Sequence, residues 1–228
     1  MKHEILLGLT TTPGSDWRGK VEEMKKFGIK RIALFPTFLG VHERKELYEL
    51  LEQIKGLEIP HVHLRAQDMH DWEMEWFEKH GAQTYNIHMG MHAKSFDALN
   101  PYIHKIFVEN HIHKAIPEDQ LESAAGICLD FQHWEIAKKS HPRVAEKTLQ
   151  YADKFKTGCC HISAMPKWKN FLMRLMKKVS GHYLVTLDEM DYMKGFGKYL
   201  PRYASIELEN TFERQLEIKA YLEKMLEI

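Results

Sequence analysis

The chain has 228 residues, of which 44% are hydrophobic and 28% are charged, a composition typical of a folded globular domain. Its 32 basic and 32 acidic residues give a formal net charge of zero. This balance argues against a protein whose binding depends mainly on phosphate contacts, and against one that binds membranes through a polybasic surface. No apolar run approaches the about 20 residues of a membrane span, and the N-terminal segment lacks a secretory pattern. Because Cys128, Cys159 and Cys160 form no disulfide framework, we expect a cytoplasmic protein.

Runs typical of strands alternate with amphipathic helical runs along the whole chain, without a linker or low-complexity segment. The first unit shows the pattern: an apolar run is followed by Asp16, which can cap a helix, and then by Gly28, which can end it. The expected strands cover residues 4–10, 30–36, 60–64, 84–89, 105–110, 126–131, 157–163 and 204–209. The expected helices cover residues 16–27, 43–55, 71–80, 117–125, 142–155, 168–179 and 211–226.

Eight strand candidates, most of them followed by a helix, predict a single-domain (β/α)8 TIM barrel over residues 1–228. The helix after the fourth strand is weak over residues 93–102, where Asn100 and Pro101 interrupt it, and residues 183–200 have no clear assignment. A doubly wound open sheet is the alternative. We prefer the barrel because no strand is followed by a glycine-rich phosphate-binding motif.

Polar residues gather late in the expected strands, where the active site of a TIM barrel lies. Six consecutive strands contribute them: His61 and His63, His88, Glu109, Asp130 with His133 just beyond, His161, and Glu207 with Glu209. Singly, each fits an ordinary core or rim residue, but carboxylates inside apolar runs are costly to bury without a cation or a hydrogen-bond network. Converging imidazoles and carboxylates predict a divalent metal site for Mn, Zn, Co or Fe, with the identity open. His63 is favoured over His61 because it lies nearer the strand end.

At these residues the chain resembles the xylose isomerase-like TIM barrels, the superfamily that holds sugar and sugar-phosphate isomerases and epimerases together with endonuclease IV. The segments that carry the resemblance are ICLDFQH, FVEN, HIS, SIELE and NIHMGMH. In the isomerase branch it implies one metal held by Glu109, Asp130, His161 and Glu207, with His133 on the substrate or a second metal. In the endonuclease branch it implies that His63 and His88 join a multi-metal cluster, with His92 as the second histidine of NIHMGMH.

The sequence departs from both branches after the seventh strand. The endonuclease branch carries a D-x-H there, which the segment KKVSGHYLVTLDEM lacks. The isomerase branch usually has an Asp near its strand-seven histidine, whereas this chain reads HISAMP. A complete trinuclear site is therefore not expected.

The preferred function is a divalent-metal-dependent isomerase or epimerase that acts on a small sugar, sugar phosphate or hydroxy-ketone through an enediolate. Glu109 and Glu207 are the expected proton carriers. The expected substrate-binding residues are His63, His133, Arg65 and Lys167, although solvated rim charges are the more common role for the last two.

Two other functions stay open. An endonuclease IV-like metal-dependent phosphodiesterase would use a second metal at His63, His88 and His133, but the neutral charge and short chain disfavour nucleic acid as a partner. The second open function is a barrel that binds metal or sugar without turnover. We expect a small carbohydrate as partner and no membrane. Trp72 and Trp76, four apart on a helix face, are expected to pack against a neighbouring element or a second subunit of a homo-oligomer.

Overall fold

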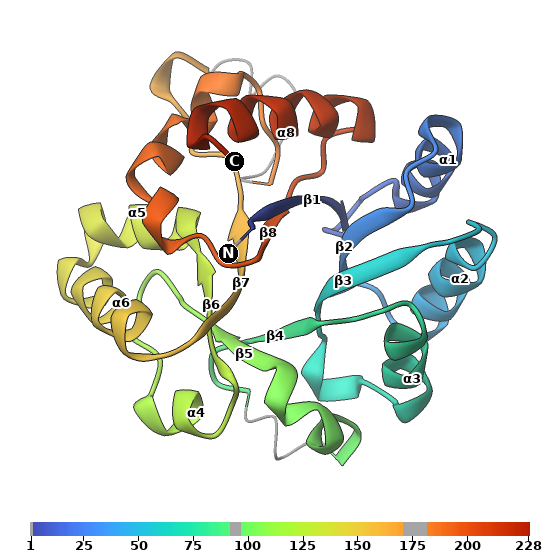
Figure 1. Cartoon of the computed structure of the whole chain (residues 1–228), viewed down its shortest axis with the longest axis horizontal. Coiled ribbons are helices and arrows are strands. Elements are labelled where there is room, and N and C mark those ends of the chain that lie inside the picture. The colour runs from blue at the N-terminus through green and yellow to red at the C-terminus, as the bar shows by residue number, and fades with distance from the viewer. Residues whose placement is uncertain (1, 92–96, 171–181) are drawn as a thin grey trace.

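The computed structural model describes residues 2–91, 97–170 and 182–228, in which eight parallel strands close into one barrel surrounded by helices (Figure 1). Each strand pairs with its neighbours in sequence, and β8 pairs with β1 to close the ring. The strands are β1 (Glu4–Thr10), β2 (Arg31–Phe35), β3 (Glu58–His63), β4 (Thr84–His88), β5 (Ile106–Glu109), β6 (Gly126–Asp130), β7 (Thr157–Ile162) and β8 (Tyr203–Ile206). The predicted (β/α)8 barrel is confirmed, and the open sheet is wrong.

The helices cover the outside of the barrel and alternate with the strands along most of the chain. They are α1 (Trp17–Phe27), α2 (Val41–Leu51), α3 (Asp71–Lys79), α4 (Glu118–Glu122), α5 (Phe131–Ser140), α6 (Pro142–Lys154) and α8 (Phe212–Leu226). The first shows why the local sequence forms a helix: the Asp16 side chain accepts a hydrogen bond from the Gly19 amide, and Gly28 ends the helix with a left-handed φ of 64°. In the described residues, no helix has the length and apolarity needed to cross a membrane.

One helix was not expected from the sequence. The predicted sixth strand extended to Phe131, but β6 ends at Asp130, and α5 begins at the next residue. The Asp130 carboxylate accepts a hydrogen bond from the His133 amide, which caps α5, and the helix buries Phe131 and Trp134 against the barrel. His133 therefore lies in the first turn of a helix rather than beyond the end of a strand.

The segments with weak or missing assignments form short 3-10 helices. After β4, residues Asp97–Lys105 form η3 in place of a regular helix. The stretch before β8 forms η5 (Leu187–Gly195) and η6 (Gly197–Tyr199), and it buries Met190, Met193 and Phe196. These 3-10 helices are therefore packed against the rest of the chain. Of the helix expected over residues 168–179, only η4 (Trp168–Asn170) lies in the described residues.

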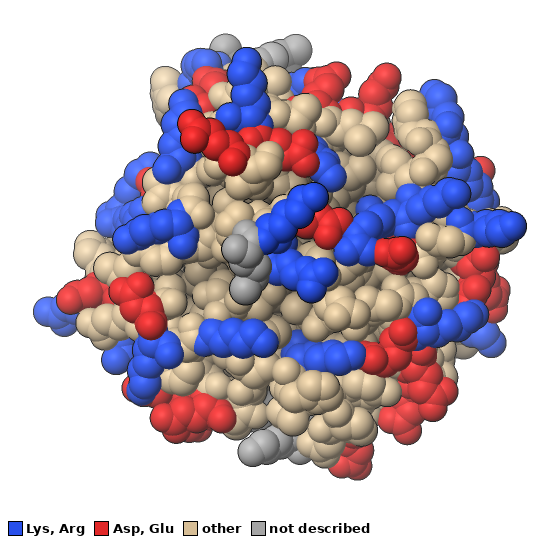
Figure 2. Space-filling view, in the orientation of Figure 1, with Lys and Arg blue, Asp and Glu red and all other residues tan. Residues whose placement is uncertain are grey.

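The barrel interior is apolar toward the end where the strands begin. Leu6, Ala33, Phe35 and Tyr203 form one buried cluster, in which Phe35, at the end of β2, also meets the rings of His61, His63 and His161. Phe107 packs with Cys128 and Cys159 in another cluster. Figure 2 views the face where the strands begin, and lysine and arginine side chains gather around its middle. The carboxylates and most of the inward-facing histidines lie toward the opposite mouth, where the strands end.

Trp72 and Trp76, which were expected to pack against a neighbouring element or a second subunit, pack against a helix of the same chain. The Trp76 ring stacks on Tyr48 of α2 with ring centroids 4.5 Å apart, and Trp72 meets the same tyrosine edge-on at 5.9 Å. Trp72 keeps 39% of its surface exposed. The face of α3 that carries both tryptophans is thus covered mainly by α2.

Candidate metal centre

The ends of six neighbouring strands bring the predicted site residues together at the mouth. His63, His88, Glu109 and Asp130 are the last residues of β3, β4, β5 and β6, His161 is the next-to-last residue of β7, and Glu207 follows β8 directly. Alternate residues of a strand point to the same side, so these positions face into the barrel. Of these side chains, only that of His88 is exposed.

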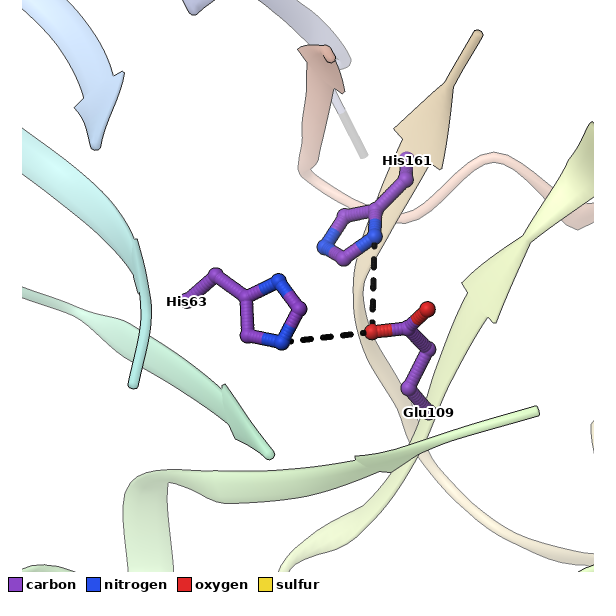
Figure 3. A group of neighbouring side chains, drawn as sticks. All are labelled: His63, Glu109 and His161. Carbon is purple, nitrogen blue, oxygen red and sulfur yellow. Dashed lines mark ion pairs between the residues drawn. The ribbon is translucent and has the colours of Figure 1, made fainter. Parts of the chain in front are cut away.

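Glu109 stands at the middle of this group (Figure 3). Its Oε2 atom lies 3.5 Å from Nε2 of His63 and 3.6 Å from Nδ1 of His161, and Figure 3 shows both rings turned toward the carboxylate. Its Oε1 atom lies 3.5 Å from Nδ1 of His133. One buried carboxylate therefore contacts imidazoles from three different elements.

Asp130 and Glu207 extend the site on either side of Glu109. The Asp130 Oδ2 atom lies 3.5 Å from Nδ1 of His133, and the Glu207 Oε2 atom lies 3.4 Å from Nδ1 of His161. Nδ1 of His133 also lies 3.0 Å from the Asn110 carbonyl, which holds the ring in place. The Asn110 side chain in turn bonds to the backbone amide and carbonyl of Asp130.

Burial sets the protonation preferences of these groups. The pKa of Glu109 is raised well above its usual value by burial first, and then by the nearby carboxylates of Asp130 and Glu207. Burial and the charge of Asp130 raise the pKa of Glu207 in the same way. Burial lowers the pKa of both His63 and His161 well below the ordinary value. In the absence of a cation, burial therefore favours the protonated form of Glu109 and Glu207.

The donor atoms fit a divalent cation. Three overlapping groups have ligand atoms within 4.8 Å of one another: His63, Glu109 and His161; Glu109, Asp130 and His133; and Asp130, His161 and Glu207. The 3.4 to 3.6 Å gaps around His161 Nδ1 are too long for good hydrogen bonds. They match the about 3.4 Å between two donors that each lie about 2.1 Å from one tetrahedral ion.

Buried ring nitrogens without hydrogen bonds, and buried carboxylates without a lysine or arginine partner, also favour a bound cation. Both ring nitrogens of His63 and Nδ1 of His161 are buried without a hydrogen-bond partner. Within the described part of the chain, no lysine or arginine forms an ion pair with Glu109, Asp130 or Glu207. Buried polar atoms and charges of this kind are costly unless a partner reaches them, and a cation at this position would supply one.

Three predicted site residues stand apart from the metal-binding groups. The His88 ring lies 4.5 Å from the His63 ring, but it belongs to none of the three groups found in the described residues. Arg65 bonds to the Leu39 carbonyl and to Asp68, and Lys167 pairs with Asp188 at 2.9 Å. Their substrate-binding roles stay predictions. His92 lies outside the described residues.

Glu209, expected on the same face as Glu207, forms a separate cluster. β8 ends at Ile206, and the Glu209 carboxylate turns to Lys20 of α1, at 2.5 Å from its Nζ atom. It also accepts hydrogen bonds from the Thr12 amide and the Ser15 hydroxyl. The loop after β1 thus takes up this carboxylate, and it does not face the mouth with Glu207.

Asn86 is a site residue that the sequence reasoning missed. It lies two residues before His88 in β4, on the inward face, and it contacts Glu109, His161 and His61. His61, deeper than His63, also bonds to Ser205. The alternation of β4 could have placed Asn86 inside the barrel, but an asparagine carries no charge that would mark it as a candidate.

A scan against models of protein families and a search of curated proteins both find no match. Among solved structures, a putative uncharacterized protein from Parabacteroides distasonis is similar at 12% identity, with a TM-score of 0.51 over 97% of this chain and 98% of that one. Dihydropteroate synthase from Thermus thermophilus is similar at 13% identity, with a TM-score of 0.51 over 98% and 92% of the two chains. A 3-keto-D-glucoside 4-epimerase from E. coli has 10% identity and a TM-score of 0.48 over 99% and 100% of the two chains, which is too low to carry an argument. The first two likenesses are to the fold alone, and the chemistry has to be argued from the site.

Proposed function

We propose that the chain is a divalent-metal-dependent isomerase or epimerase that acts on a small sugar, sugar phosphate or hydroxy-ketone. The observation that carries the proposal is the set of three buried carboxylates, Glu109, Asp130 and Glu207, whose ion-pair partners in the described residues are all histidines. Such a set needs a cation to be stable in its charged form. The resemblance to the xylose isomerase-like barrels supports this choice of chemistry.

The metal would be held by Glu109, Asp130, His161 and Glu207, with zinc, manganese and cobalt all compatible with these donors. When bound, it would polarise the substrate carbonyl and stabilise the negative charge that develops on the substrate oxygens. Asp130 also caps α5, so its carboxylate is fixed by the helix that it begins. The ligand set therefore rests on strand ends and one helix start, which are rigid positions.

Glu109 and Glu207 would move the proton between neighbouring substrate carbons. Both lie against His161 Nδ1, and burial raises the pKa of each in the metal-free protein. Glu207 keeps about a tenth of its side chain exposed at the mouth, where a substrate would enter. His63 and His133, which lie beside Glu109, would orient substrate hydroxyls.

Two measurements test the proposal. The first is the metal content per chain after purification without chelator, for the wild type and for a Glu109→Gln/His161→Ala variant. The matched control is Glu118→Gln/His113→Ala, which changes the same residue types outside the three groups. We expect close to one Mn, Co or Zn in the wild type and the control, and none in the site variant. No metal after reconstitution would overturn the proposal.

The second measurement is deuterium exchange from solvent into small ketoses, with and without a phosphate group, followed by NMR. Proton transfer next to the carbonyl predicts deuterium at that carbon in the wild type and its loss in Glu109→Gln and Glu207→Gln. A metal-loaded protein that exchanges no proton of any ketose would contradict isomerase chemistry.

Metal-dependent phosphodiester hydrolysis is the second candidate. The contact between the His63 and His88 rings favours it, because it extends the imidazole group toward the mouth. It predicts two or more zinc ions per chain and hydrolysis of bis(p-nitrophenyl) phosphate that is lost in His88→Ala. Metal binding without either activity would favour the third candidate, a barrel that binds metal or sugar without turnover.

A further inference from the structure

The hydrogen bonds of Asn86 connect three of the inward-facing polar residues. Its Nδ2 atom donates to Oε2 of Glu109 at 3.0 Å, and its Oδ1 atom lies 2.9 Å from Nε2 of His61 and 3.3 Å from Nε2 of His161. The amide and both rings are fully buried. These contacts have no solvent competitor, so their donor and acceptor roles must be mutually consistent.

The orientation of the Asn86 amide determines these roles. Its NH₂ group can only donate, and it lies against Glu109, so the amide oxygen lies against the two histidines. An amide oxygen is an acceptor, so Nε2 of His161 must carry the hydrogen. Neutral imidazole has one N–H, and Nδ1 of His161 is therefore left with a free lone pair.

That lone pair lies where the metal site needs it. Nδ1 of His161 is 3.6 Å from the Glu109 carboxylate and 3.4 Å from the Glu207 carboxylate, and it has no hydrogen-bond partner. With the other tautomer, an Nδ1–H group would donate to one of these carboxylates and block the ligand position. The choice of tautomer therefore decides whether His161 can bind a cation.

We propose that Asn86 is the positioning residue of the metal centre: it holds His161 as the Nε2–H tautomer and, through the same amide, aims the Glu109 carboxylate. The inference rests on the proposed metal site, but the tautomer is a property of the metal-free protein. Ser205 supports the arrangement from below, because its hydroxyl lies 2.7 Å from Nδ1 of His61, whose Nε2–H can then donate to Asn86.

The test is ¹⁵N NMR of the histidine rings in metal-free protein at pH 8, which identifies the protonated nitrogen of His161. We expect the Nε2–H tautomer in the wild type and in Asn86→Asp, which keeps an oxygen acceptor. In Asn86→Leu, which has a similar shape but no acceptor, we expect Nδ1 to become protonated toward Glu207. Metal affinity of the leucine variant, measured by titration with Zn²⁺, should fall by about 10- to 100-fold.

The matched control is Asn210→Leu, which removes another buried asparagine, one that bonds to the Leu184 backbone away from the metal groups. It should lose stability but keep the His161 tautomer and the Zn²⁺ affinity. An Nδ1–H tautomer in the wild type, or an unchanged tautomer in Asn86→Leu, would overturn the role of Asn86. Absence of Zn²⁺ binding in a wild type with the expected tautomer would instead overturn the proposed function.

Discussion

Replacing Glu109 by glutamine should stabilise the metal-free protein at pH 8 and abolish its stabilisation by metal. Glutamine has nearly the same shape and can still accept the hydrogen bond from Asn86 Nδ2. It removes one negative charge from a buried group that also contains Asp130 and Glu207. The substitution thus separates the electrostatic repulsion within the carboxylate cluster from the contribution of side-chain packing to stability.

The size of the gain follows from the spacing of the ligand atoms. Ligand atoms of Glu109 and Asp130 lie within 4.8 Å of each other, and two unit charges at that distance repel by about 3 kcal/mol at an effective dielectric constant of 20. The wild type avoids part of this repulsion by keeping a proton on the cluster. We therefore expect a gain of about 1 to 3 kcal/mol in the free energy of unfolding, or roughly 2 to 4 °C in Tm per kcal/mol.

The gain should depend on pH with a definite sign. The pKa of Glu109 is raised in the folded state, so folding takes up protons above the unfolded pKa, and this carboxyl destabilises the wild type increasingly as pH rises through the folded value. Glutamine does not titrate. The stability difference between variant and wild type should be near zero at about pH 4.5 and should grow toward pH 8. The histidines remain in both proteins, so their opposite pH dependence largely cancels.

Urea unfolding at pH 5 and pH 8, with and without Zn²⁺, provides the assay. Saturating metal at 100 times its Kd should add about 2.7 kcal/mol to the wild type and nothing to Glu109→Gln. Glu118→Gln, at an exposed pair with Lys154, serves as the control and should change stability by at most about 1 kcal/mol. A metal-free Glu109→Gln protein that is less stable than the wild type at pH 8 would refute the reasoning.

Three further substitutions test other contacts. Asp130→Asn should keep the cap of α5 and lose metal binding, whereas Asp130→Ala should lose both and be about 1 kcal/mol less stable than Asp130→Asn, which urea titration can resolve. Arg44→Met should destabilise the protein by about 3 to 5 kcal/mol, because it leaves the fully buried Glu73 carboxylate without its cation; a loss under about 1 kcal/mol would contradict this. Gly158→Ala should lower Tm, because the added Cβ would lie 2.1 Å from the Phe107 ring. We expect this overpacking to reduce the free energy of unfolding by about 1 to 3 kcal/mol. An unchanged Tm would show that the ring can move.

The sequence by itself was enough to predict the barrel and the residue types at its mouth. Strand and helix periodicities are local properties, and an alternation of eight units leaves few other topologies. The predicted first strand, residues 4–10, has the bounds of β1. The rule that TIM-barrel sites lie at strand ends then selected the histidines and carboxylates of the mouth, and the family resemblance implied Glu109, Asp130, His161 and Glu207 among them as metal ligands. In the structure these four residues are shared among three overlapping groups that also include His63 and His133, and the full ligand set stays a prediction.

Tertiary structure decided which of those side chains meet and what holds them. Glu207 and Glu209 look equivalent in the segment SIELE, but β8 ends before both, and the second one is bound by Lys20 of α1 and by the loop after β1. Asn86 has no charge and no motif, and its role arises only because strands β3, β4, β5 and β7 bring His61, Glu109 and His161 around its amide. Such contacts depend on the relative stagger of strands far apart in the chain. Local periodicity carries no information about that stagger, and the closed hydrogen-bonded ring of the barrel fixes it.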